Sequence, residues 1–199
     1  MRIKKSTLII AIGFILFVRV FGGLIAGSSD LLKAYCGAAV LKEAFANLSV
    51  VSSLRDSALQ EVIAQAGQRK GLNSLCELKE AASKKARLKV RAVQVKFEDL
   101  RDLFQKGQLI ASITGNRHFC LIRQIDGDQI KVYIPGINYE NPVIRKEEFL
   151  EAWDNNVILI VSNSEIRTNF PFVPDDKLQE IFGGQPCLNC LGSSGTYTG

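Results

Sequence analysis

Two residues of this sequence are suited to thiol chemistry. Cys36 stands where a helix is expected to begin, and three small residues, Gly37-Ala38-Ala39, follow it. The free N–H groups and the partial positive charge of a helix N-terminus favour a thiolate, and small neighbours let a peptide backbone approach. His118 is the single histidine of the chain, and it begins a predicted strand. A cysteine on a helix and a histidine on a distant strand predict a nucleophile and its general base.

Both residues also have simpler structural interpretations. Most cysteines are small buried hydrophobes, and a lone histidine is most often a structural residue. A single histidine also excludes metal sites that need two or three imidazoles, and we expect no metal and no cofactor. Cys120 alternates onto the same strand face as His118, so a second thiol is expected near the site.

The composition indicates a folded domain of ordinary size. The 199 residues are 47% hydrophobic and 23% charged, with a net charge of +5. This is not the composition of a disordered chain. Basic residues between Lys79 and Arg91 are interpreted as a solvated helix face, because no aromatic residues interleave them. No nucleic-acid partner is therefore expected.

Residues 1–29 are predicted to be a membrane anchor or a signal segment. Three basic residues precede an apolar stretch, Thr7 to Ala26, that approaches the ~20 residues needed to span a bilayer as a helix. As an uncleaved anchor, it would place the body outside the cytoplasm, in the periplasm of a Gram-negative bacterium. Cleavage near Ala26-Gly27-Ser28 is the alternative, and would give a secreted protein.

The body, residues 30–161, is predicted to be an α+β domain with helices first and an antiparallel sheet second. Helical periodicity, a Ser-x-x-Glu capping box at Ser74 and the Asp126-Gly127 hairpin signal support this order. The predicted helices are Cys36–Leu48, Leu54–Ala66, Ser74–Lys84, Phe97–Gln105 and Lys146–Trp153. The predicted strands are Leu88–Val95, Leu109–Ile113, His118–Gln124, Gln129–Ile134 and Val157–Val161.

Three segments of the body together resemble one enzyme family. They are Cys36-Gly37-Ala38-Ala39-Val40-Leu41 opening a helix, Gly71-Leu72-Asn73-Ser74-Leu75, and His118-Phe119 followed by strand, turn and strand. Their order and spacing resemble the bacteriocin-processing, double-glycine-specific cysteine peptidases over about Asp30 to Val161. The resemblance implies a papain-like fold, Cys36 as nucleophile, His118 as base and peptides as substrates. Such domains are often fused to peptide exporters, which implies membrane-complex partners.

Two positions depart from that family's pattern. Ile134-Pro135 stands where the family has Asp-Pro, and Asp30 stands where it has an oxyanion-hole glutamine. Loss of the equivalent acid costs about 10⁴-fold in a serine protease, and Asn138 is a candidate replacement for orienting His118. Two hypotheses follow. The chain is a divergent thiol peptidase, or it is an inactive peptidase-like subunit of a membrane complex that binds a peptide or a partner protein.

The tail, residues 162–199, is expected to be irregular apart from one short helix, Asp175–Phe182. Leu178, Ile181, Gly183 and Gly184 reproduce the pattern of a double-glycine leader, with apolar residues seven and four positions before the cut. Such a leader binds as a helix in an apolar groove, with Gly-Gly entering a narrow channel. The tail would then be a self-substrate or a plug. Alternatively, Gly183-Gly184 simply ends the helix.

The last two cysteines form a single C-x-x-C pair. Cys187 and Cys190 lie in a Gly/Ser/Thr-rich stretch with no second pair of similar spacing, so they do not make a four-ligand zinc site. A local disulfide between them is expected outside the cytoplasm.

Overall fold

The computed structural model describes residues 35–113, 118–135 and 141–184, all within one compact unit, Lys33–Gly199. Residues 1–29, and with them the predicted anchor, lie outside the described residues, as do Asp30, Asn138, Cys187 and Cys190. Within the three described ranges, no helix is long and apolar enough to cross a membrane.

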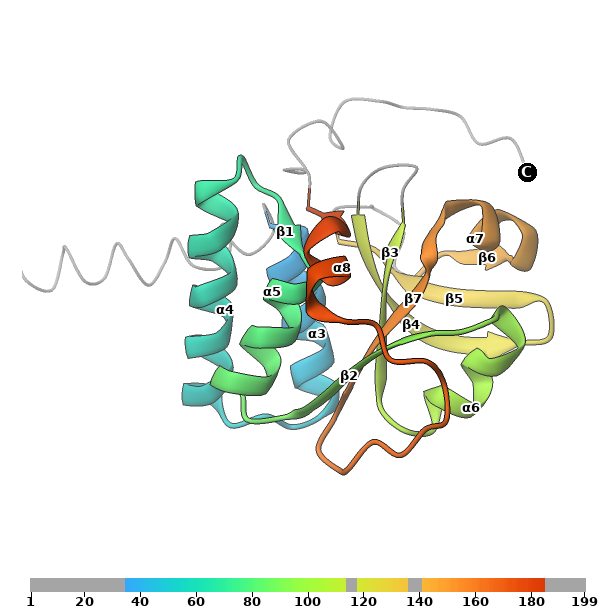
Figure 1. Ribbon diagram of the computed structural model, residues 1–199, viewed down its shortest axis with the longest axis horizontal. Helices are drawn as coiled ribbons and strands as arrows, with labels where there is room; N and C mark the ends of the chain where they lie inside the picture. Colours follow the sequence, from blue (N-terminus) through green and yellow to red (C-terminus); the bar gives the residue numbers. More distant parts are fainter. Residues whose placement is uncertain (1–34, 114–117, 136–140, 185–199) are drawn as a thin grey trace, which may run out of the picture. The chain divides into compact units, whose positions relative to one another are not determined.

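The described chain is α+β, as predicted, with three helices before a mainly antiparallel sheet (Figure 1). The α-helices are α3 (Cys36–Asn47), α4 (Ser52–Gln68), α5 (Leu75–Glu80), α6 (Leu100–Phe104), α7 (Lys146–Ala152) and α8 (Asp175–Glu180). A π-helical turn (Ala81–Lys85) extends α5, and a 3-10 turn (Phe97–Asp99) precedes α6. The strands are β1 (Asn73–Ser74), β2 (Lys89–Gln94), β3 (Gln108–Ile113), β4 (His118–Asp126), β5 (Gln129–Tyr133), β6 (Val143–Arg145), β7 (Trp153–Ser162) and β8 (Phe182–Gly183).

The helices α3, α4 and α5 gather on one side of the sheet (Figure 1). Helix α5 begins where the sequence predicted, at a capping box. The Ser74 hydroxyl accepts a hydrogen bond from the Glu77 N–H at 3.2 Å, and a Glu77 carboxylate oxygen accepts one from the Ser74 N–H at 2.9 Å. These bonds satisfy two N–H groups that a helix start leaves without partners.

The main sheet has six strands in the order β2-β7-β3-β4-β5-β6, and neighbouring strands are antiparallel. The hairpin between β4 and β5 turns at Asp126-Gly127, where Gly127 has a φ of +57°. This is the left-handed conformation that glycine adopts without a steric penalty, so the hairpin prediction is confirmed.

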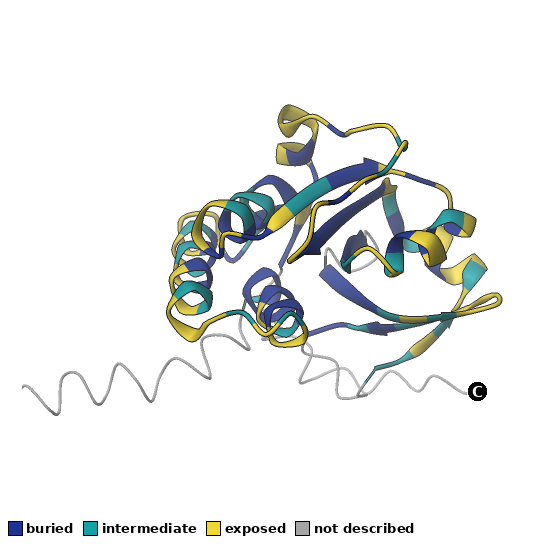
Figure 2. Ribbon diagram, turned by 90° about the horizontal axis from the view of Figure 1, so that it is seen from below, coloured by how far each residue is buried: buried dark blue, intermediate teal, exposed yellow. Residues whose placement is uncertain are grey.

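The two faces of β4 serve different parts of the core. Cys120 and Ile122 belong to a cluster with Phe149, Trp153 and strand residues of β3, β5 and β7. Phe119 and Leu121 are fully buried outside that cluster, and α3 packs against β4. Because side chains alternate along a strand, Phe119 and Leu121 face the helices, whereas His118 shares the face of Cys120. Figure 2 shows the resulting buried interior beneath an exposed outer surface.

The tail follows the body closely as far as Gly184. Residues 171–173 run beside β2, where the Gln94 N–H donates to the Pro171 carbonyl at 3.1 Å and the Val173 N–H to the Ala92 carbonyl at 3.1 Å. Helix α8 then packs against α5, and β8 pairs with β1.

The tail helix is shorter than the sequence suggests. It ends at Glu180, and Ile181 already has extended dihedral angles, φ −93° and ψ 106°. Phe182 and Gly183 pair with β1 instead of continuing the helix. Gly183-Gly184 therefore does not cap α8, and the alternative interpretation of these glycines as a helix end is wrong.

Candidate active site

Cys36 is the first residue of α3, and its side chain is completely buried. The Phe119 N–H donates a hydrogen bond to the Cys36 sulfur at 3.2 Å, and the thiol lies 3.4 Å from the Phe119 carbonyl oxygen that it can donate to. The start of α3 is thus fixed against the start of β4. The sulfur lies beside the main chain of the residue that directly follows His118.

The β4 edge at Phe119 is available to the thiol because β5 pairs further along the strand. Phe119 pairs with Ser112 of β3 on one side, while the ladder to β5 begins only at the pair Leu121–Tyr133. A strand residue directs its N–H and C=O to the same side, so those of Phe119 meet Cys36 instead of another strand.

His118 is nearly buried, with 5% of its surface exposed. Burial lowers the pKa of His118, because a low-dielectric environment disfavours the charged imidazolium. Among the described residues, its Nδ1 atom has no hydrogen-bond partner. The ring is therefore neutral at neutral pH and able to accept a proton.

Ile134 lies on the same strand face as His118. Continuing the pair Leu121–Tyr133 by one step places Ile134 opposite Cys120, two residues from His118. Its side chain is 7% exposed and belongs to the apolar cluster. The position cannot supply an acid, and the absence of a partner for the imidazole Nδ1 within the described residues agrees with that.

Cys120 and Cys76 are buried free thiols, and neither is arranged for chemistry. Burial raises the pKa of Cys120 to about 12, although a main-chain hydrogen bond from Ala111 opposes the shift. Burial also raises the pKa of Cys76, with nearby carboxylates adding to the effect. Cys120 shares a face with His118 as predicted, but a protonated core thiol is not a second nucleophile.

Ser112, Asn73 and Asp154 also lie near this end of the sheet, and none of them is a site residue predicted from the sequence. The Ser112 hydroxyl donates to the Phe182 carbonyl at 3.0 Å, and Asn73 forms a β-pair with Gly183. Burial raises the pKa of Asp154, and the nearby Ser112 hydroxyl, whose single proton can go to either Asp154 or Phe182, lowers it by less. Only Ser112 could have been found from the sequence. A hydroxyl inside the apolar run Leu109–Ile113 is buried, and a buried hydroxyl needs a hydrogen-bond partner.

The four leader-like residues of the tail are all buried. Leu178 and Ile181 belong to the hydrophobic interior, and Gly183 lies against the Phe119 ring. The structure thus brings Cys36, His118, Gly183 and Gly184 to one region, through Phe119 and β1.

The profile of the Peptidase C39 family matches residues 35–165, about two thirds of the chain. The chain belongs to the Peptidase C39 family. The resemblance to double-glycine-specific peptidases is therefore confirmed, and identities of 21% and 18% to solved structures agree with a divergent member. Among curated protein sequences, none matches this C39 chain significantly.

Solved structures show the same fold. A double-glycine motif protease from an AMS/PCAT transporter, crystallised with its leader peptide, is 21% identical with a TM-score of 0.51. The alignment covers 66% of this C39 chain and 86% of the other. The peptidase domain of Streptococcus ComA, a bifunctional ABC transporter involved in quorum sensing, is 18% identical with a TM-score of 0.50, covering 66% and 93%. At these identities, the similarity establishes the fold.

Proposed function

We propose that this C39 domain is a divergent thiol peptidase in which Cys36 is the nucleophile and His118 the general base. The hydrogen bond from the Phe119 N–H to the Cys36 sulfur carries this proposal, because it holds the thiol beside the residue that follows His118. The helix start at Cys36 supplies a partial positive charge that favours thiolate.

The proposed reaction uses these two side chains and water. The neutral His118 ring takes the thiol proton while the Cys36 sulfur attacks a peptide carbonyl carbon. The carbon–nitrogen bond then breaks, the imidazolium gives its proton to the leaving amine, and water hydrolyses the thioester. With Ile134 in place of an orienting acid, and with no partner for the imidazole Nδ1 among the described residues, turnover is expected to be slow.

Leader peptides of the double-glycine type are the proposed substrate class. The related AMS/PCAT protease was crystallised with its leader peptide, which supports peptide binding by the same fold. Both related domains belong to transporters, and a membrane transport complex is the corresponding partner that we propose.

The rival proposal is a peptidase-like subunit that binds peptides without cleaving them. Ile134, together with Asp30 at the position of the oxyanion-hole glutamine, favours it. Alkylation of Cys36 as a function of pH distinguishes the two, with His118→Ala as the matched variant and Cys36→Ala as the blank. A peptidase site predicts a reactivity midpoint below the ~8.5 of a free thiol, and a higher midpoint in His118→Ala. An ordinary thiol profile in both would refute the peptidase proposal.

We further propose that residues 1–29 anchor the chain in a bacterial membrane, with the domain on the extracytoplasmic side. The apolar stretch Thr7–Ala26 behind a basic N-terminus supports this arrangement. Membrane fractionation of the full chain, followed by protease treatment of intact cells or spheroplasts, tests both anchoring and sidedness. Release of the intact domain into the medium would indicate the cleaved alternative.

A further inference from the structure

A short strand of the tail lies beside the candidate active site, in the groove formed by β1 on one side and Ser112 of β3 on the other. β8 pairs with β1 in antiparallel register, with Gly183 opposite Asn73 and Phe182 opposite Ser74. The Ser112 hydroxyl donates to the Phe182 carbonyl at 3.0 Å from the neighbouring sheet. Main-chain pairing on one side and a side-chain donor on the other are typical of a bound extended peptide.

Apolar anchors hold the residues that precede this strand. Leu178 is completely buried where α8 packs against α5, and Ile181 is 3% exposed. The Leu75 N–H donates to the Ile181 carbonyl at 2.8 Å, and Lys79 of α5 forms a salt bridge with Asp175 of α8. In contrast, Gln179 and Glu180 between the anchors are exposed. One face of the segment is thus bound and the other is free.

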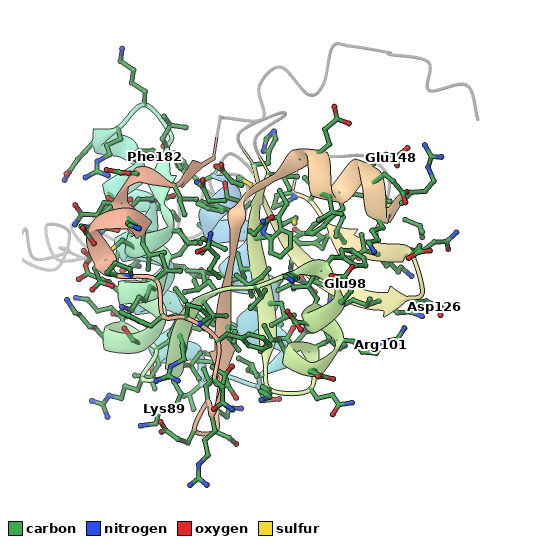
Figure 3. All side chains as sticks on the ribbon, turned by 45° about the vertical axis from the view of Figure 1, so that its right-hand side comes forward. Lys89, Glu98, Arg101, Asp126, Glu148 and Phe182 are labelled. Carbon is green, nitrogen blue, oxygen red and sulfur yellow. The ribbon has the colours of Figure 1, made fainter. Side chains whose placement is uncertain are left out.

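The two glycines fit where no side chain would. A Cβ atom at Gly183 would lie 2.8–2.9 Å from three atoms of the Phe119 ring. At Gly184, where φ is +111°, a Cβ atom would lie 2.8 Å from the Gly71 carbonyl oxygen. Phe182, labelled in Figure 3, is partly exposed, with Arg69 6.0 Å from the centre of its ring. The narrow part of the groove therefore begins at Gly183, next to the residue that holds the Cys36 sulfur.

We propose that this groove is a peptide-binding site whose resident ligand is the chain's own segment Pro174–Gly184, which excludes other peptides from Cys36. The inference rests on the proposed peptide-binding function. Cys36 is completely buried and His118 is 5% exposed, so a substrate reaches neither residue in this conformation. The segment lies against Phe119, the residue that contacts the Cys36 sulfur. The segment must leave the groove before a peptide from another chain can enter.

A competition experiment with the full chain tests the proposal. A fluorescein-labelled synthetic peptide with the sequence of residues 172–184 is titrated against the Cys36→Ala protein, in which cleavage cannot occur, and anisotropy is recorded. Leu178→Asp should release the segment, because it puts a charge into a fully buried apolar contact. Gln179→Asp changes the adjacent exposed residue and is the matched control.

We expect the Leu178→Asp protein to bind the peptide at least tenfold more tightly than the parent and the Gln179→Asp control. Equal affinities in all three, or no binding by any of them, would overturn the proposal. If circular dichroism shows that Leu178→Asp does not fold, Gly183→Ala replaces it, since its methyl group would lie 2.8–2.9 Å from atoms of the Phe119 ring.

Alkylation separates failure of this inference from failure of the proposed function. With Cys36 restored, release of the segment should raise the Cys36 alkylation rate at least tenfold in Leu178→Asp and leave Gln179→Asp unchanged. An unchanged rate in Leu178→Asp would overturn the plug. A lowered alkylation midpoint with no change in peptide affinity would keep the thiol site and reject the resident ligand.

Discussion

Replacing Ile134 with aspartate should return a carboxylate to the strand face that carries His118. Ile134 directly follows the Leu121–Tyr133 pair, and extending that register by one step puts it opposite Cys120, which shares a face with His118. Ile134 and Cys120 belong to the same apolar cluster. A carboxylate there favours the imidazolium, so the pKa of His118 should rise relative to an Ile134→Asn protein, in which the side chain has similar size but no charge. Both substitutions remove the same buried aliphatic group.

The cost in stability follows from the burial of Ile134. The side chain is 7% exposed within the apolar cluster, and losing such a group costs about 2–5 kcal/mol. This is less than the ~5–15 kcal/mol stability of most single domains, and it applies to both variants. Urea unfolding should therefore show a loss for both variants near neutral pH, and a larger loss for Ile134→Asp, because burying a carboxylate costs more free energy than burying an amide.

The assay uses the single histidine of the chain, whose NMR signals need no assignment. The pKa of His118 is read from its ring proton shifts, and the Cys36 alkylation rate is measured on the same samples. We expect a higher His118 pKa and an alkylation rate about tenfold higher in the aspartate variant, a gain worth about 1.4 kcal/mol. Identical His118 titrations in the two variants would show that residue 134 does not face the imidazole, and would refute the reasoning.

Three further outcomes are expected. Ser74→Ala should lower the free energy of unfolding by about 0.5–2 kcal/mol, measured by thermal denaturation, since it removes half of the capping box; no loss would contradict that role. Because burial lowers the pKa of His118 in the folded chain, the unfolded chain binds the proton first as pH falls, and the free energy of unfolding should decrease below about pH 6.5. This decrease should be absent in His118→Gln, and an increase due to His118 would reject the burial argument. Gly67→Ala should stabilise the chain by about 0.5–1 kcal/mol, because nothing lies within 4 Å of the added methyl group. Gly37→Ala should destabilise it, because its methyl group would lie 2.8 Å from the Asn73 side-chain oxygen. Melting temperatures of the two variants that move in the same direction would contradict this contrast.

Periodicity and turn chemistry were sufficient to predict the elements that form from local signals. The capping box at Ser74 and the Asp126-Gly127 turn are local features, and both have the predicted geometry. The short strands β1 and β8 were missed because each is extended only by pairing with the other, more than one hundred residues away. The same non-local pairing ended α8 two residues earlier than the sequence suggests.

The candidate site could be predicted in part. Residue type and position singled out Cys36 and His118, and the fold brings the sulfur of one beside the neighbour of the other. Ser112 and Phe119 were not singled out, because their contacts with Phe182 and Gly183 depend on how the tail folds back. A pattern within one segment cannot show which distant groove will receive it.

The tail also covers the outer strand of the main sheet. β2 is the first strand in the sheet order, so one of its edges has no neighbouring strand in the main sheet. The tail bonds to β2 through the Gln94 N–H and the Pro171 carbonyl, and through the Val173 N–H and the Ala92 carbonyl. An uncovered strand edge is a template for pairing with another chain. If the tail detached not only at β8 and α8 but also back to Pro171, main-chain N–H and C=O groups of β2 would lose their partners and become exposed. Detachment of the tail back to Pro171 would therefore let β2 pair with a strand of a second chain. Access to the Cys36 thiol and self-association of the domain are thus linked through one segment.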